Sequence, residues 1–148
     1  MTIDDVDVST ADIVRIPTGN VRVPRPEFVA LWRTAERFHD EQIRRGVPDW
    51  YGAGVVETCR WLANTIVKSE AGGPERLAPS PVTERVTVAH EELIEAECVA
   101  AEKLAACRPV PTRLIHRPGW IDAVVTTLNW AWRRYGKPPL DTDRTAAS

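Results

Sequence analysis

The sequence predicts an all-α, four-helix bundle-like domain of two helical hairpins, preceded by a short extended or hairpin N-terminal arm. Apolar residues recur at three- and four-residue spacing over four stretches of the chain, which is typical of amphipathic helices. Gly and Pro separate these stretches. The second and fourth stretches also share a short motif, which indicates an internal duplication. The expected helices span about residues 26–45, 51–70, 81–107 and 119–135.

The composition is that of an ordinary globular domain. The 148 residues are 43% hydrophobic and 27% charged, which argues against a disordered chain or a disulfide scaffold. A net charge of -2 gives no overall attraction to nucleic acid or membrane. Sixteen arginines against three lysines are typical of a GC-rich bacterial genome.

The cysteines and the N-terminus indicate the compartment. The chain has an odd number of cysteines, Cys59, Cys98 and Cys107. The last two lie about 13 Å apart on one expected helix, which is too far for a disulfide. The chain begins without a basic and apolar leader, and no apolar run reaches the ~20 residues of a membrane span. We therefore expect a cytoplasmic protein with free thiols.

The first 25 residues are expected to form an acidic tail and an arm. Residues 13–16 and 21–23 are rich in β-branched side chains and flank the turn-like residues 17–20. A hairpin would place Arg15 opposite Arg22, which costs stability because the charges are alike. An extended arm is the alternative.

The first two helices follow from their apolar positions. In the first, these are Phe28, Leu31, Trp32, Ala35 and Phe38, and Gly46 and Pro48 end the helix. In the second, they are Val55, Cys59, Leu62 and Ile66. Residues 72–81 hold two Gly, three Pro and a Ser, and form the one plausible internal linker.

The third and fourth helices complete the domain. Ser80 is a favourable N-cap with Pro81 at the first helical position. An apolar stripe follows at Val82, Val86, Ala89, Leu93, Ala96, Ala100 and Leu104. After a loop with three prolines, the last stripe contains Ile121, Val124, Val125, Leu128, Trp132 and Tyr135. Residues 138–148 form a polar tail.

A repeated motif relates the second helix to the fourth. Residues 55–61 and 124–130 share the pattern V-V-x-T-x-x-W, and a P-x-W precedes each copy. Two duplicated hairpins related by a pseudo-two-fold axis would give a four-helix bundle.

The tryptophans of this motif lie away from the apolar seam of their helices. Trp61 and Trp130 stand two residues after the seam residues Cys59 and Leu128, about 200° round the helix. Two interpretations follow. Either both helices are buried on two sides, or an exposed ledge binds another protein or a second copy of the chain. The ledge would consist of Thr58, Trp61, Thr127 and Trp130.

Charges of opposite sign gather around the last two helices. Six basic residues bracket the fourth helix: Arg108, Arg113, Arg117, Arg133, Arg134 and Lys137. The third helix carries acids at Glu84, Glu91, Glu92, Glu95, Glu97 and Glu102. Such patches steer an acidic partner, pair two protomers or bind phosphate backbones. We consider nucleic acid the least favoured of these partners, and the cations near the end of the fourth helix also suit its dipole.

Two patterns raise the question of an enzyme. Glu36 and His39 form an E-x-x-H unit, which di-iron bundles use twice, but this chain has it once, so we predict no metal and no cofactor. Arg85 and His90 resemble the Arg-to-His motif of compact helical nucleases of the HEPN type, although Val86 replaces the polar residue that usually follows the Arg. That resemblance implies a His base and an Arg that steadies a phosphate.

The sequence as a whole therefore predicts a non-catalytic protein-interaction or assembly module, expected to oligomerise and not to bind membranes. A small HEPN-like ribonuclease using Arg85 and His90 is the alternative.

Overall fold

The computed structural model of the chain describes residues 8–67 and 73–142, and these are mostly helical. The elements in chain order are α2 (Thr10–Arg15), η1 (Thr18–Asn20), α3 (Arg25–Arg44), α4 (Trp50–Leu62), β1 (Ile66–Val67), β2 (Arg76–Leu77), α5 (Glu91–Ala106), α6 (Thr112–Ile115), α7 (Trp120–Leu128) and η2 (Asn129–Arg133). Within these ranges, no helix combines the length and the apolar character that crossing a membrane requires.

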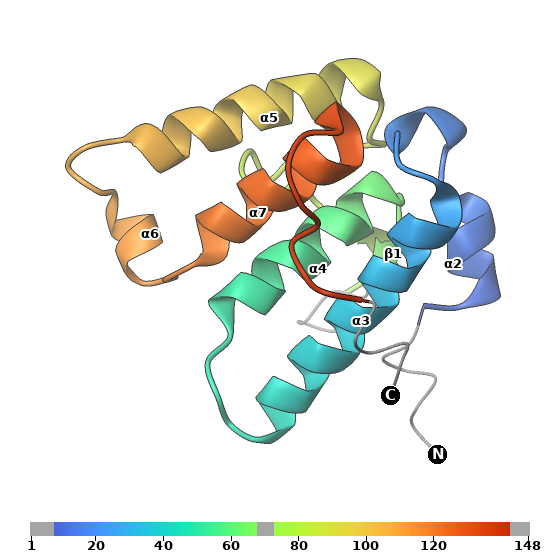
Figure 1. Cartoon of the computed structure of the whole chain (residues 1–148), viewed down its shortest axis with the longest axis horizontal. Helices are drawn as coiled ribbons and strands as arrows, with labels where there is room; N and C mark the ends of the chain where they lie inside the picture. Colours follow the sequence, from blue (N-terminus) through green and yellow to red (C-terminus); the bar gives the residue numbers. More distant parts are fainter. Residues whose placement is uncertain (1–7, 68–72, 143–148) are drawn as a thin grey trace.

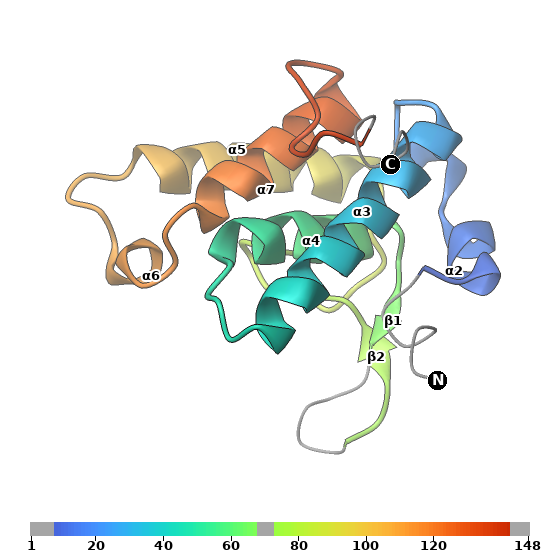
Figure 2. The ribbon, with the colours of Figure 1, turned by 60° about the horizontal axis from the view of Figure 1, so that its bottom comes forward.

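The longer helices form two antiparallel pairs, α3 with α4 and α5 with α7 (Figure 1). Helices α4 and α7 lie side by side in the middle of the molecule, while α3 packs on α4 and α5 packs on α7. The short β1–β2 pair is antiparallel and extends away from the helices (Figure 2). The core therefore centres on the contact between α4 and α7.

The absence of a side chain at Gly54 lets α4 and α7 approach closely. A Cβ atom built there would lie 2.7 Å from the carbonyl oxygen of Trp120 and 2.8 Å from the Cβ of Ala123. Next to this contact, the hydroxyl of Thr58 donates to the carbonyl of Gly54 and that of Thr127 to the carbonyl of Ala123, each at 2.7 Å. Both threonines are thus buried without an unsatisfied hydroxyl.

The N-terminal arm is helical where the sequence predicted an extended segment or a hairpin. Ser9 and Asp12 form a capping box that begins α2, because each side chain accepts a hydrogen bond from the other residue's backbone N–H. The expected turn is present as η1, but the described residues form no strands beside it. Most of the expected acidic tail, residues 1–7, lies outside the described residues.

Helix α4 is shorter than the predicted 51–70. It ends at Leu62, and Asn64 adopts a left-handed backbone with φ of 54°, a conformation that Asn tolerates better than most residues. The β-branched residues that follow begin β1, with Ile66 opposite Leu77 and Val67 opposite Arg76.

Helix α5 begins at Glu91, ten residues after the predicted start. The buried carboxylate of Glu97 accepts hydrogen bonds from the backbone N–H groups of Val82 and Thr83 and from the Thr83 hydroxyl. Ser80 accepts from the backbone N–H of Arg85, so it caps a turn and not a helix. The predicted helix start at Ser80 is therefore wrong: the Glu84 N–H donates to the Ser80 carbonyl, but the left-handed backbone of Glu84, with φ of 57°, ends the turn there.

Helices α3 and α7 lie where the sequence places them. The prediction for α3 differs by one residue at each end, and α7 continues into a π-helical turn, η2. Asn20, which is 2% exposed, links the arm to the end of α4 and to the segment before α5, because its amide donates to the carbonyls of Leu62 and Ala89.

Candidate functional site

Three of the four residues predicted to form an exposed ledge are buried. Thr58 and Thr127 are 0% exposed and Trp61 is 2% exposed. They belong to the core because α4 and α7 are covered on two sides, which is the other interpretation that the sequence offered. Trp130 differs from them in being half-buried. The ledge is therefore not formed, and Trp130 alone of the four reaches the surface.

Trp130 borders a cleft between α3 and the C-terminal segment. The cleft has a volume of about 600 Å³. Its lining comes from α3, η2 and the segment after η2, and consists of Pro26, Glu27, Ala30, Leu31, Arg33, Thr34, Arg37, Trp130, Pro138, Asp141 and Thr142. We call this the Trp130 cleft. Its volume lies within the ~300–1,000 Å³ usual for binding sites.

A second hollow of about 410 Å³ continues the cleft along α3. The two hollows share Thr34, Arg37 and Asp141, so together they make one elongated depression. The second hollow is lined mostly by apolar surface, to which Phe38 and Leu140 contribute. Phe38 is 48% exposed. Apolar surface with a charged margin is the usual character of a docking surface.

Charged side chains of both signs line the cleft. Arg33 and Arg37 stand one helical turn apart on α3, and Glu27 and Asp141 lie in the same lining. The Arg33 guanidinium donates to the carbonyl of Val8 at 3.3 Å.

The C-terminal wall of the cleft is held to the core. The Tyr51 hydroxyl donates to the carbonyl of Pro139 at 3.0 Å. Burial, and then the nearby Asp122, raise the pKa of Tyr51, while a hydrogen bond with Thr126 opposes the rise. The sequence predicts a polar tail over residues 138–148, of which 143–148 lie outside the described residues, but Pro139 is buried. The apolar Pro138, Pro139 and Leu140 were the signal that part of this segment packs.

A much smaller hollow, of about 70 Å³, lies beside Trp61. Trp61 shares it with Leu93, Ala96 and Glu97 of α5 and with Ser80, Thr83, Arg85 and Thr87 of the turn before α5. The turn and α5 therefore both face the Trp61 indole, which is 2% exposed.

The predicted basic patch is divided between the two ends of α7. At the N-terminal end, the guanidinium of Arg113 lies 4.9 Å from the centre of the Trp120 ring, and that of Arg117 lies 5.3 Å from it. Arg117 also lies 5.4 Å from the ring of Trp50, which is 36% exposed. Arg108 is exposed and donates to backbone carbonyls at the end of α5.

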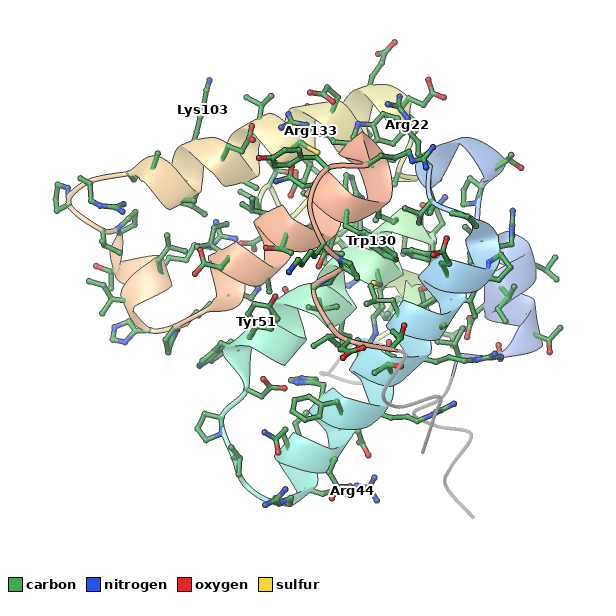
Figure 3. All side chains as sticks on the ribbon, viewed as in Figure 1. Arg22, Arg44, Tyr51, Lys103, Trp130 and Arg133 are labelled. Atoms are coloured by element: carbon green, nitrogen blue, oxygen red, sulfur yellow. The ribbon has the colours of Figure 1, made fainter. Side chains whose placement is uncertain are left out.

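At the other end of α7, Arg133 joins two acids of α5 within the chain. It donates to Glu95 at 3.0 Å and to Glu102 at 2.8 Å. The Trp132 indole also donates to Glu95, and the hydrogen bonds from Trp132 and Arg133 lower the pKa of that carboxyl. Arg133 therefore links η2 to α5 by hydrogen bonds. Arg134 and Lys137 are exposed. Figure 3 shows Arg133 close to α5.

The two residues of the E-x-x-H unit bind different partners. Glu36 accepts two hydrogen bonds from Arg60, at 2.8 and 2.7 Å, and one from the Trp32 indole. His39 lies 3.2 Å from Asp49. Among the described residues, no group of three or more His, Cys, Asp and Glu side chains is arranged to hold a metal ion.

Glu57 is a half-buried carboxyl close to this cluster. It accepts a hydrogen bond from the Trp120 indole at 3.1 Å. Burial raises the pKa of Glu57, while the Trp120 hydrogen bond and the charges of Arg117, Arg60 and His39 oppose the rise. Burial likewise raises the pKa of the Cys59 and Cys98 thiols, that of Cys98 to about 12.

Arg85 and His90 do not lie on one helix. Arg85 belongs to the turn over Trp61, whereas His90 is the exposed N-cap residue of α5 and stands outside the lining of that hollow. The helical spacing that the resemblance to the nuclease motif requires is therefore absent.

No protein-family model, curated protein or solved structure matches the chain.

Proposed function

We propose that the protein is a non-catalytic interaction module that docks another protein in the Trp130 cleft. The observation that carries this proposal is the different burial of two tryptophans at matching positions of the repeated motif. Trp61 is 2% exposed, while Trp130 is half-buried and borders a cleft of about 600 Å³. Indole rings are frequent hot spots of protein interfaces, because each buries a large apolar area at a small loss of side-chain entropy.

The surroundings of Trp130 support docking over reaction chemistry. The cleft is lined by apolar side chains, two arginines and scattered acids. His39 of α3 pairs with the carboxylate of Asp49 at the start of α4, and it is not part of the cleft lining. The C-terminal wall is fixed through Pro139, so part of the surface exists before a partner binds, which reduces the entropy cost of association.

We also propose that the chain is a duplicated helical hairpin arranged as a four-helix bundle. Four pairs of positions in α4 and α7 support this proposal. Thr58 bonds to the carbonyl of Gly54 as Thr127 bonds to that of Ala123. Two contacts between α4 and α7 are also equivalent. Trp120 of α7 bonds to Glu57 of α4, and Tyr51, the counterpart of Trp120 in α4, bonds to Thr126, the counterpart of Glu57 in α7.

A photo-crosslinking experiment tests the docking site. The photoreactive residue p-benzoylphenylalanine replaces Thr34, which lines both hollows. A matched control carries it at Lys103, an exposed residue on the outer side of α5 (Figure 3). The two proteins are irradiated in the source cell, and the crosslinked products are compared by mass.

We expect a discrete crosslinked product from position 34 and none from position 103. A product of twice the chain's mass would identify a second copy as the occupant, in keeping with the predicted oligomer. Equal crosslinking from both positions, or no product from position 34, would contradict docking in this cleft.

A further inference from the structure

The chain covers one of its two matching tryptophans with a segment of its own. The inference drawn from this contrast rests on the proposed docking function and on the proposed duplication. Trp61 of α4 borders α5, the outer helix of the other hairpin, and Trp130 borders α3, the outer helix of the first. The two indoles therefore have equivalent places in the duplicated fold.

The cover of Trp61 is a proline-containing turn. Ser80 donates its backbone N–H to the carbonyl of Arg85 and accepts the Arg85 N–H on its side chain, which closes the turn. Pro81 is buried, and its carbonyl accepts from Arg113. The cover leaves a hollow of only about 70 Å³ beside Trp61.

Over Trp130 the described chain has no comparable cover. Pro138, Asp141 and Thr142 line one side, and a volume of about 600 Å³ stays open above the α3 wall. A segment the size of the Ser80–Arg85 turn would fill space of this order. Among the described residues, the cleft thus has room for a covering segment of about that size.

The polar groups of the two outer helices differ in sign. At the Trp61 site, α5 supplies the carboxylate of Glu97, which accepts hydrogen bonds from the covering turn. At the Trp130 site, α3 supplies Arg33 and Arg37. A guanidinium has five N–H donors, so each arginine can keep its present contacts and still donate to an added carboxylate.

We propose that the Trp130 cleft binds a proline-containing segment of a separate partner protein, with a single acidic residue close to the proline. The segment covers Trp130 as the Ser80–Arg85 turn covers Trp61, and its acid accepts from Arg33 or Arg37. Glu27 and Asp141 also line the cleft. They repel a run of acidic residues, so one acid beside an apolar, proline-containing core fits the charges best.

Peptide binding to the full chain tests this proposal. The probes are three ten-residue, fluorescein-labelled peptides that share a central Ser-Pro-Val and differ only in the next residue, which is Glu, Ser or Lys. Fluorescence anisotropy measures their dissociation constants. We expect the Glu peptide to bind most tightly and the Lys peptide at least about 10-fold more weakly, because one charged hydrogen bond is replaced by like-charge repulsion.

Four variants locate the binding. Trp130→Ala should weaken the Glu peptide at least about 10-fold, as expected for a hot-spot aromatic, whereas Trp50→Ala, at an exposed ring outside the cleft, should not. Arg37→Gln should reduce the preference for Glu over Ser. Thr34→Arg should block the cleft from the surface of α3, and it keeps the test decisive if Trp130→Ala does not fold.

The outcomes separate this inference from the proposed function. Binding of the Glu peptide that is lost in Trp130→Ala or Thr34→Arg supports both. Another outcome is that no peptide binds, or that the Lys peptide binds best, while the photoreactive residue at position 34 still crosslinks to a partner. In that case the proposed peptide class is wrong and the proposed docking function is supported. A crosslink from position 34 to a second copy of the chain also overturns the proposal that the occupant is a separate protein. Failure of both experiments overturns the docking function itself.

Discussion

Gly54→Ala tests whether close approach of α4 and α7 organises the fold. The added methyl group would lie 2.7 Å from the Trp120 carbonyl oxygen and 2.8 Å from the Ala123 Cβ, where ordinary contacts begin at 3.4 Å. The helices must therefore separate by about 0.7 Å, because neither neighbour is the end of a flexible side chain. Overpacking of this kind costs about 1–3 kcal/mol.

The net effect is smaller than this cost. Replacing a helical Gly by Ala contributes about 1 kcal/mol of helix propensity in the favourable direction. Because one neighbour is backbone, we expect the upper part of the cost range and a net loss of about 1–2 kcal/mol in the free energy of unfolding. For a chain of this length, that loss lowers Tm by about 3–6 °C.

Urea unfolding followed by circular dichroism measures the effect. The midpoint should fall while the slope stays the same, since one added methyl group hardly changes the surface exposed on unfolding. Adding Ala123→Gly removes one of the two contacts, so Gly54→Ala should cost less in that background by about 0.5 kcal/mol or more. A neutral or stabilising Gly54→Ala, or full additivity of the two changes, would refute the close contact.

Three further predictions concern the buried carboxylates of Glu36 and Glu97 and the half-buried carboxylate of Glu57. Glu57→Gln should raise stability at neutral pH. Burial raises the pKa of Glu57 in the folded protein above its usual 4.5, so the wild-type protein loses stability as pH rises and this carboxyl ionises, whereas the glutamine variant does not. The difference in Tm between the two proteins, measured from pH 4 to 8, should grow with pH. Glu97→Ala should release the turn over Trp61 and increase iodide quenching of tryptophan emission; unchanged quenching would count against the cover. Arg60→Ala should cost about 1–3 kcal/mol, because it leaves the Glu36 carboxylate, 10% exposed, without its cation, and Arg60→Lys should recover part of this loss in the same urea assay.

Helices with a clear apolar stripe and local end signals were predictable from the sequence. Helix α3 agrees with its prediction to within one residue at each end, because Pro26 and Gly46 mark its ends in the sequence. The stop of α4 at Leu62 was missed, although Asn64 and the β-branched residues after it are signals for such an end. Ser9 and Asp12, the capping box of α2, are a further local signal, and they favour a helix over the predicted extended arm or hairpin.

The start of α5 was not predictable from local signals. Ser80 and Pro81 are a favourable helix start, and the Glu84 N–H does donate to the Ser80 carbonyl, but Glu84 adopts a left-handed backbone with φ of 57° that ends the turn. The same limit applies to the site. The spacing of Trp61 and Trp130 on their helices is identical, so their different burial depends on the segments around them. The turn before α5 borders Trp61, whereas Pro138, Asp141 and Thr142 line only one side of the cleft at Trp130.

Comparative affinity capture from the source cell tests the central claim most directly. The wild-type chain, Trp130→Ala and Trp50→Ala serve as baits, and the retained proteins are quantified by mass spectrometry. Trp50 is the matched control, since it is an exposed indole outside the Trp130 cleft. We predict at least one protein that the wild type and Trp50→Ala retain and that Trp130→Ala loses while its circular dichroism spectrum stays the same. Retention of the same proteins by all three baits would contradict docking at Trp130.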